Sequence, residues 1–192
     1  MKKLILFVAV ISTGLLAFKP IANIWSVDNA HSKLGFEITH LMLTDIEGSF
    51  KNVESKITAS KADFSDAVVE LTAEVNSVNT DNEKRDAHLQ AADFFDAAKY
   101  PNLTFKSTSF KKVGNNKYKV AGNLNFHGVT KPVTLDAVLK GINVNAATKK
   151  ETAGFKVTGT IKRSDFNFGS KYPTAMLSDE VNLNANVQFV KN

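Results

Sequence analysis

The C-terminal part of the chain alternates strictly between apolar and polar residues. From Val181 to Phe189 every second residue is apolar, and asparagine or glutamine stands between them. A similar alternation runs through residues 68–75 and 133–140. Because successive side chains of a strand point to opposite faces, the pattern predicts strands with one buried and one wet side. Strands of parallel sheets are apolar throughout, so the pattern favours an antiparallel sheet.

Further strands are expected where apolar residues recur between turn residues. They lie near residues 24–28, 33–39, 46–60, 103–111, 117–126 and 154–166, which makes about eight or more strands in all. Residues 141–154 are predicted to form a long, mobile polar connection. Two architectures fit this meander: a β-sandwich or an up-and-down barrel. Long strands and short hairpins favour the barrel, although periodicity alone does not decide between the two.

Residues 80–100 interrupt the strand pattern. Thr80 and Glu83 have the spacing of a capping box, which predicts a helix that starts there and continues through Ala92. Pro101 disfavours the helical state at the preceding residue and returns the chain to a strand. We therefore expect a helical insertion near residues 81–98.

The N-terminus has the composition of a secretory signal peptide. Two lysines precede an apolar run from Leu4 to Phe18, and small residues follow. The run is shorter than the ~20 residues that span a bilayer, which disfavours the alternative of a retained anchor. We assign residues 1–22 to the signal peptide, with the cleavage position left open, and residues 23–192 to a single domain. The expected location is periplasmic or secreted, with no stable membrane span after cleavage.

The composition argues against disulfides, lipid attachment and nucleic-acid binding. Cysteine is absent, so neither a disulfide nor lipoprotein acylation is available. The formal net charge is +5, but the lysines are scattered rather than clustered on one predicted face. Nucleic-acid binding is therefore not expected.

The residues offer no signature of catalysis or metal binding. The four histidines, His31, His40, His88 and His127, are far apart, and no zinc-binding, nucleophile-elbow or phosphate-loop motif occurs. A metal site of His88 with Asp93 or Asp96 would lack a good third ligand. We predict no catalytic residues, no metal and no cofactor, and hence a protein that is not an enzyme.

Phenylalanine is unusually abundant: the chain has 14, against three tyrosines and one tryptophan. In a sandwich these rings would pack against one another. In a barrel they could line a pocket for an apolar ligand, whose burial would gain about 25 cal/mol per Å² of apolar area.

Several segments carry a family resemblance. These are, in order, WSVDNAHSKLGFEITHLMLTDIEGSF, RDAHLQAADFFDAAKYPNLTFKS, KVAGNLNFHGVTKPVTLDAVLKG, IKRSDFNFG and DEVNLNANVQF. Together they resemble the YceI-like family, the polyisoprenoid-binding lipocalin-like proteins. The resemblance implies an extended antiparallel eight-stranded barrel, secreted to the periplasm, with a long apolar channel for isoprenoid chains or other long amphiphiles such as fatty acids and their amides. The chain departs from the family pattern at NFGSKYPTAML, which is expected to be a mobile loop.

The same resemblance names candidate site residues by position. It implies that rings line the channel, namely Phe36, Phe50, Phe94, Phe95, Phe105, Phe126 and Phe166. Polar residues of the same motifs would either contact a ligand head group or buttress the barrel, namely His40, Arg85, His88, Arg163 and Asp165.

The resulting prediction is a binding or carrier protein for an isoprenoid or fatty-acyl lipid held inside the barrel. Two alternatives stay open. One is a lipid-acting enzyme that uses His40 or His88 with a carboxylate at a cavity, and the other is a ligand-free structural or interaction module. The oligomeric state, including a homodimer, is also left open.

Overall fold

The computed structural model describes residues 21–192, so the predicted signal peptide lies outside the described residues except for its last two positions. Strands dominate, and the described part holds one α-helix, α1 (Glu83–Gln90). The strands are β1 (Asn23–Val27), β2 (Lys33–His40), β3 (Thr44–Phe50), β4 (Val53–Ala59), β5 (Val68–Glu74), β6 (Val78–Asn79), β7 (Asn102–Gly114), β8 (Lys117–Phe126), β9 (Val129–Val144), β10 (Glu151–Lys162) and β11 (Leu177–Lys191). Three short 3-10 helices are η1 (Asn29–His31), η2 (Val75–Ser77) and η3 (Arg163–Phe166).

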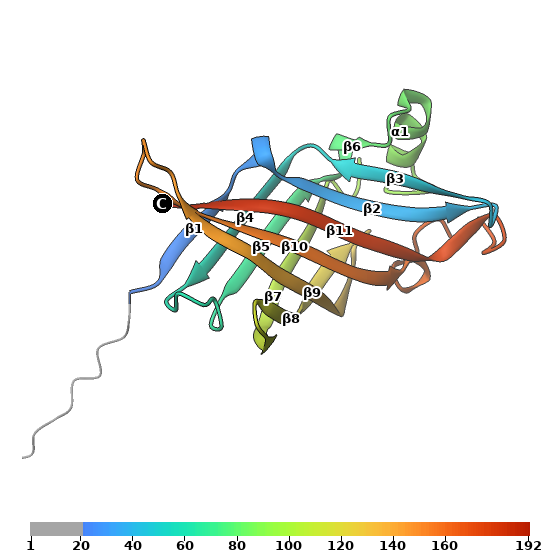
Figure 1. Ribbon diagram of the computed structural model, residues 1–192. Coiled ribbons are helices and arrows are strands. Elements are labelled where there is room, and N and C mark those ends of the chain that lie inside the picture. Colours follow the sequence, from blue (N-terminus) through green and yellow to red (C-terminus); the bar gives the residue numbers. More distant parts are fainter. Residues whose placement is uncertain (1–20) are drawn as a thin grey trace, which may run out of the picture.

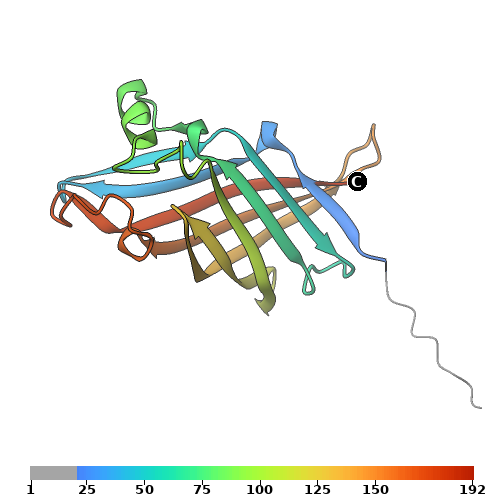
Figure 2. The ribbon, with the colours of Figure 1, turned by 180° about the vertical axis from the view of Figure 1, so that it is seen from behind.

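The strands close into an antiparallel barrel of eight strands (Figures 1 and 2). The ring runs β1-β4-β5-β7-β8-β9-β10-β11 and closes where Trp25 of β1 pairs with Lys191 of β11. Beyond this ring, β2 continues along the first half of β11, and β3 and β6 follow it. The predicted eight-stranded lipocalin-like barrel is confirmed, and the sandwich is excluded because the pairing of β1 with β11 closes the strands into one ring.

The helical insertion is present where the sequence predicts it, but the predicted capping box is wrong. Asn82 caps α1 by accepting a hydrogen bond from the backbone NH of Arg85 (3.0 Å). The NH and hydroxyl of Thr80 instead donate to Oδ1 of Asp86, at 2.8 and 2.5 Å. Asp81 has a φ of 59°, which turns the chain between Thr80 and the helix. The helix ends at Gln90 because Ala91 is extended.

The connection between β9 and β10 is shorter than predicted. Both strands extend into it, up to Val144 and from Glu151, and only residues 145–150 form the loop. Asn145 closes the loop by accepting from the NH groups of Ala147 and Thr148, both at 2.9 Å. The alternation fades in this hairpin because residues 141–150 are exposed on both faces.

Aromatic packing fills the barrel near the loop between β4 and β5. Phe64 of that loop is 1% exposed, and its ring lies 5.2 Å from those of Trp25 and Phe155. The hydroxyl of Tyr118 donates to the backbone carbonyl of Asp63 at 2.7 Å and fastens the loop to β8. Some of the phenylalanines therefore pack against one another and close this part of the barrel.

The outer surface carries a cross-strand ion-pair network that predicts a pH dependence. Glu70 of β5 lies 2.7 Å from the Lys56 Nζ and 2.9 Å from the Lys106 Nζ, on the two neighbouring strands. The hydrogen bonds from these lysines lower the pKa of Glu70 from 4.5 to about 2. A carboxylate with a lowered pKa stabilises the fold above its unfolded-state pKa, and this contribution is lost as the pH falls from about 4.5 toward 2.

We expect Glu70→Gln to lower the free energy of unfolding at pH 6 and to have a smaller effect at pH 2.5. Urea unfolding at the two pH values measures the difference, which should shrink in high salt. Glu54→Gln on β4 is the matched control, because Glu54 forms no ion pair within residues 21–192. An effect of Glu70→Gln that is equal at both pH values would contradict this role.

Candidate functional site

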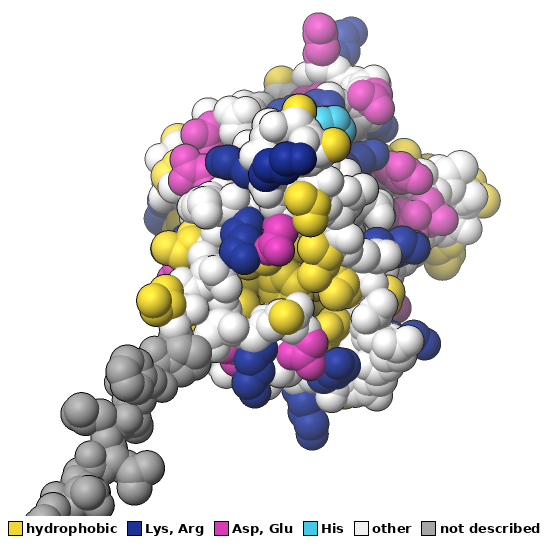
Figure 3. All heavy atoms as spheres, turned by 60° about the vertical axis from the view of Figure 1, so that its left-hand side comes forward, with side chains coloured by type: hydrophobic (Ala, Val, Ile, Leu, Met, Phe, Trp, Pro, Cys, Tyr) yellow, Lys and Arg dark blue, Asp and Glu magenta, His cyan; other side chains and the backbone are white. Residues whose placement is uncertain are grey.

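The barrel encloses a cavity of about 440 Å³ whose wall is almost entirely apolar. Its aliphatic lining comes from the inward positions of the strands, including Leu34, Leu71, Val120, Leu135 and Leu183. Hydrophobic side chains also gather in a surface hollow, with lysine and acidic side chains around it (Figure 3). Most of the alternating apolar positions therefore line the cavity, whereas the residues predicted for its wall were all aromatic.

Six of the seven aromatic residues predicted for the channel line the cavity. These are Phe36, Phe50, Phe94, Phe95, Phe105 and Phe126. Phe166 is not among the lining residues: it is 1% exposed and packs behind Phe126, with ring centroids 5.4 Å apart. It lies in η3, after the end of β10, where strand alternation no longer directs side chains inward.

Two segments far apart in the sequence form an aromatic cover over the cavity beside α1. Phe94 and Phe95, which follow the helix, pack against residues of the loop between η3 and β11. Phe94 stacks on Tyr172 at 4.9 Å, and Phe95 lies 4.8 Å from Phe168. Tyr172 and Phe168 also line the cavity and were missed, because the partners they pack against, Phe94 and Phe95, lie far away in the chain.

Arg163 organises the loop of this cover. Its side chain is buried, and its guanidinium donates to five backbone carbonyls. The acceptors are Ser178 (3.0 Å), Phe168 (3.1 Å), Gly169 (2.8 Å), Tyr172 (2.6 Å) and Leu177 (3.0 Å). Of the two roles that the sequence left open, Arg163 has the buttressing one. It anchors the loop that was expected to be mobile.

The polar candidates occupy different positions. Arg85 lines the cavity, but its Nε and one terminal nitrogen donate to the hydroxyl (2.7 Å) and carbonyl (2.6 Å) of Thr80. His40, at the end of β2, is exposed and also lines the cavity. Asp165 is exposed in η3 and is not among the lining residues.

His88 lies at the rim of the cavity with a carboxylate and a hydroxyl nearby. Its Nε2 is 3.7 Å from Oδ2 of Asp93 and 3.5 Å from the hydroxyl of Tyr172, and its side chain is 54% exposed. This is the histidine and carboxylate pair that the enzymatic alternative requires. The two serines of the cavity wall are engaged elsewhere, since Ser55 donates to the carbonyl of Glu70 (2.9 Å) and Ser32 to that of Gln188 (3.5 Å). Among residues 21–192, no group of three or more histidine, aspartate or glutamate side chains could hold a metal ion.

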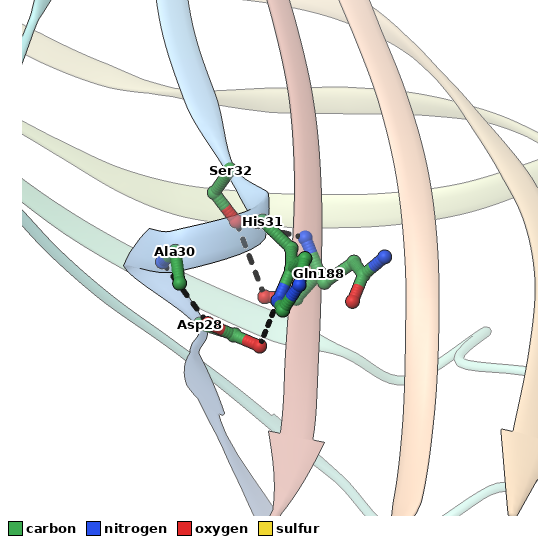
Figure 4. Close-up of polar contacts among 5 residues, drawn as sticks. All are labelled: Asp28, Ala30, His31, Ser32 and Gln188. Carbon is green, nitrogen blue, oxygen red and sulfur yellow. Dashed lines mark hydrogen bonds and ion pairs between the residues drawn. The ribbon is translucent and has the colours of Figure 1, made fainter.

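The pairing of the segment β1–β2 with the segment β3–β4 is interrupted. β1 pairs with β4 as far as Ser26 and Lys56, and β2 pairs with β3 from Leu34 and Phe50 onward. In between, η1 satisfies its own polar groups, because the side chain of Asp28 contacts the NH of Ala30 and Nδ1 of His31 (Figure 4). Cavity-lining residues lie on both sides of this break, with Asn29 and Ser32 on one side and Lys51 and Ser55 on the other.

Comparisons with known proteins agree with this architecture. The family model for the YceI-like domain matches residues 25–189. The chain belongs to the YceI-like family. It is 39% identical over 164 residues to Protein YceI of Salmonella newport (strain SL254), covering 85% of this chain and 84% of the relative. The crystal structure of the Campylobacter jejuni YCEI protein is similar, with 40% identity, a TM-score of 0.71 and coverage of 84% of this chain and 94% of that one.

A more distant structure shares the fold. A polyisoprenoid binding domain from Saccharophagus degradans aligns with a TM-score of 0.67 at 16% identity, over 88% of this chain and 98% of that domain. None of the helices within residues 21–192 has both the length and the apolar character of a membrane span.

The role of Arg163 predicts a large loss of stability on substitution. Arg163→Met removes the donor to five backbone carbonyls, two in buried and three in partly buried hydrogen bonds, which we expect to cost roughly 3 kcal/mol in the free energy of unfolding. Arg163→Lys should recover only part of it, since a single ammonium cannot match the planar guanidinium. Lys162→Met, on the exposed neighbour, should change stability by less than about 0.5 kcal/mol. Equal urea midpoints for the two Met variants would contradict the buttressing role.

Proposed function

We propose that this YceI-like protein binds or carries a long-chain apolar or amphiphilic lipid, of the isoprenoid or fatty-acyl type, inside its barrel. The observation that carries the proposal is the apolar cavity of about 440 Å³ within a closed barrel. Interiors of ordinary domains are packed nearly without voids. An apolar space of this size that the neighbouring rings leave unfilled is therefore consistent with a ligand site.

Hydrophobic burial alone would suffice for binding. Each buried methylene contributes about 0.8 kcal/mol, so about ten of them would gain about 8 kcal/mol before the cost of association. The polar end of an amphiphile would lie at the rim, where His88 and Tyr172 are close to solvent. Two of the five N–H donors of Arg85 are bound to Thr80, which fixes its side chain at the cavity and leaves the other donors for a head group.

The comparisons support the class of ligand. The Saccharophagus degradans domain is described as polyisoprenoid binding, so the shared fold is compatible with an isoprenoid chain. We further propose that residues 1–22 direct export and that the protein acts in the periplasm or outside the cell. A carrier there would shield an apolar chain from water. The serines of the wall donate to backbone carbonyls, so the enzymatic alternative rests on a histidine with a carboxylate, such as His88 with Asp93.

The proposal is tested by lipid extraction. Protein purified from its native host should release an isoprenoid or fatty-acyl lipid at a level near one per chain, as identified by mass spectrometry. Leu183→Trp places a bulky ring in the cavity, and we expect it to lower the lipid content by at least about fivefold.

Asn182→Trp is the matched control, because Asn182 is exposed on the opposite face of β11 and does not line the cavity. It should retain the lipid. If the unsubstituted protein carries no lipid, or if both tryptophan variants retain it equally, the proposed binding site is wrong.

A further inference from the structure

The turn between β2 and β3 exposes three consecutive large apolar side chains. Leu41, Met42 and Leu43 are 44%, 74% and 80% exposed, and Met176 beside them is 42% exposed. The turn lies at the far end of the molecule from the β9 and β10 hairpin in both ribbon views (Figures 1 and 2). Single exposed apolar residues are common, whereas a contiguous group at a protruding tip indicates an interaction.

The backbone of this turn makes its composition more unusual. Leu41 and Met42 have φ values of 53° and 56°, and the NH of Leu43 donates to the carbonyl of His40 at 3.0 Å. Residues 40–43 thus form a β-turn with both central residues left-handed, a conformation for which Asn-Gly is strongly preferred, and Leu43 is a third loop residue before the pair His40 and Thr44 closes the hairpin. The turn between β8 and β9 follows that preference more closely, with His127 and Gly128 at 50° and 74°. The β2 and β3 turn therefore has two costs, strained backbone and exposed apolar surface, and neither is needed to join the strands.

The tip is continuous with the cavity. The NH of Leu41 donates to the carbonyl of Met176 at 2.8 Å, and Met176 lines the cavity. Ile38 and Ile46, on the two strands that the turn joins, line it as well. An apolar path thus leads from the exposed tip along its own hairpin to the interior.

We propose that the Leu41, Met42 and Leu43 tip inserts into the surface of a lipid bilayer and brings the cavity to the membrane from which its ligand is loaded or to which it is delivered. The purpose of this docking rests on the proposed function. A narrow convex tip suits penetration between lipid head groups, whereas a protein partner would need a matching apolar socket.

The charge of the hairpin predicts which lipid head groups the tip can bind. Residues 35–50 contain no lysine or arginine and carry three acidic residues, Glu37, Asp45 and Glu47. The hairpin itself therefore offers no attraction to anionic lipids, and its contribution to the contact is apolar insertion. Binding should occur on neutral phosphatidylcholine vesicles and should persist in high salt.

The test uses residues 23–192, which contain the complete barrel and its core, so that the apolar N-terminal run does not contribute to vesicle binding. Leu41→Asn combined with Met42→Gly installs the preferred turn and should leave stability unchanged or higher. Co-sedimentation with phosphatidylcholine vesicles should fall by at least about fivefold for this variant. Should it fold poorly, Leu43→Ser keeps the turn conformation and removes the most exposed side chain.

The matched control is Ile142→Asn combined with Val144→Ser, which removes exposed apolar side chains from the opposite end of the barrel. It should sediment with vesicles as the unsubstituted protein does. The inference is overturned if the unsubstituted protein does not bind vesicles, if the tip variant binds equally well, or if the control loses binding to the same extent. A concentration-dependent dimer that the tip variant abolishes, without vesicle binding, would also overturn it in favour of a second copy.

A separate measurement distinguishes this inference from the proposed function. Binding of dansyl-undecanoic acid in solution, without vesicles, should be the same for the unsubstituted protein and the tip variant. Failure of both to bind this probe would count against the lipid cavity. The co-sedimentation with vesicles would still test whether the tip inserts into a bilayer.

Discussion

The pairing of the last strand with the first is the constraint on which the rest of the molecule depends. β11 pairs with β10 along one edge and with β1 and β2 along the other, so the meander has an inside and an outside. Once the ring is closed, alternation along each strand directs one set of side chains inward. A barrel of eight strands is just wide enough for side chains to fill it or for it to hold one small ligand. What the inward residues are then decides between a packed core and a cavity.

In this chain the inward residues form a packed core in one part of the barrel and leave a cavity in another. Around Phe64 and Trp25 the aromatic rings meet and plug the barrel, while beside α1 another set, with Phe94 and Phe95, covers it. Between them the wall is aliphatic and a space remains. The cover depends on a single buried guanidinium. Arg163 donates hydrogen bonds to several carbonyls of a loop that is not part of the sheet. The site is therefore built from one rigid element, the barrel, and one loop tied by hydrogen bonds.

The amino-acid sequence predicts the part of this arrangement that depends on local pattern. Strands, turns and the helical insertion follow from periodicity and turn chemistry, and the barrel rather than the sandwich follows from the family resemblance. The prediction of Thr80 as the helix cap was wrong. Thr80 and Asn82 are both residue types that cap helices well, and the left-handed backbone of Asp81 turns the chain so that Asn82 takes the cap position. The role of Arg163 depends on backbone carbonyls of a distant loop, which no sequence pattern displays. Tyr172 was missed for the same reason, since its partner Phe94 is far away in the chain.

We propose that the interior of the barrel is a preformed space for one long apolar chain. A crystal structure of protein purified from its native host tests this claim most directly. We predict continuous, elongated density inside the barrel, in contact with Phe36, Phe105 and Leu183 and ending near His88. A collapsed interior, in which these side chains meet one another and leave no space, would contradict the account.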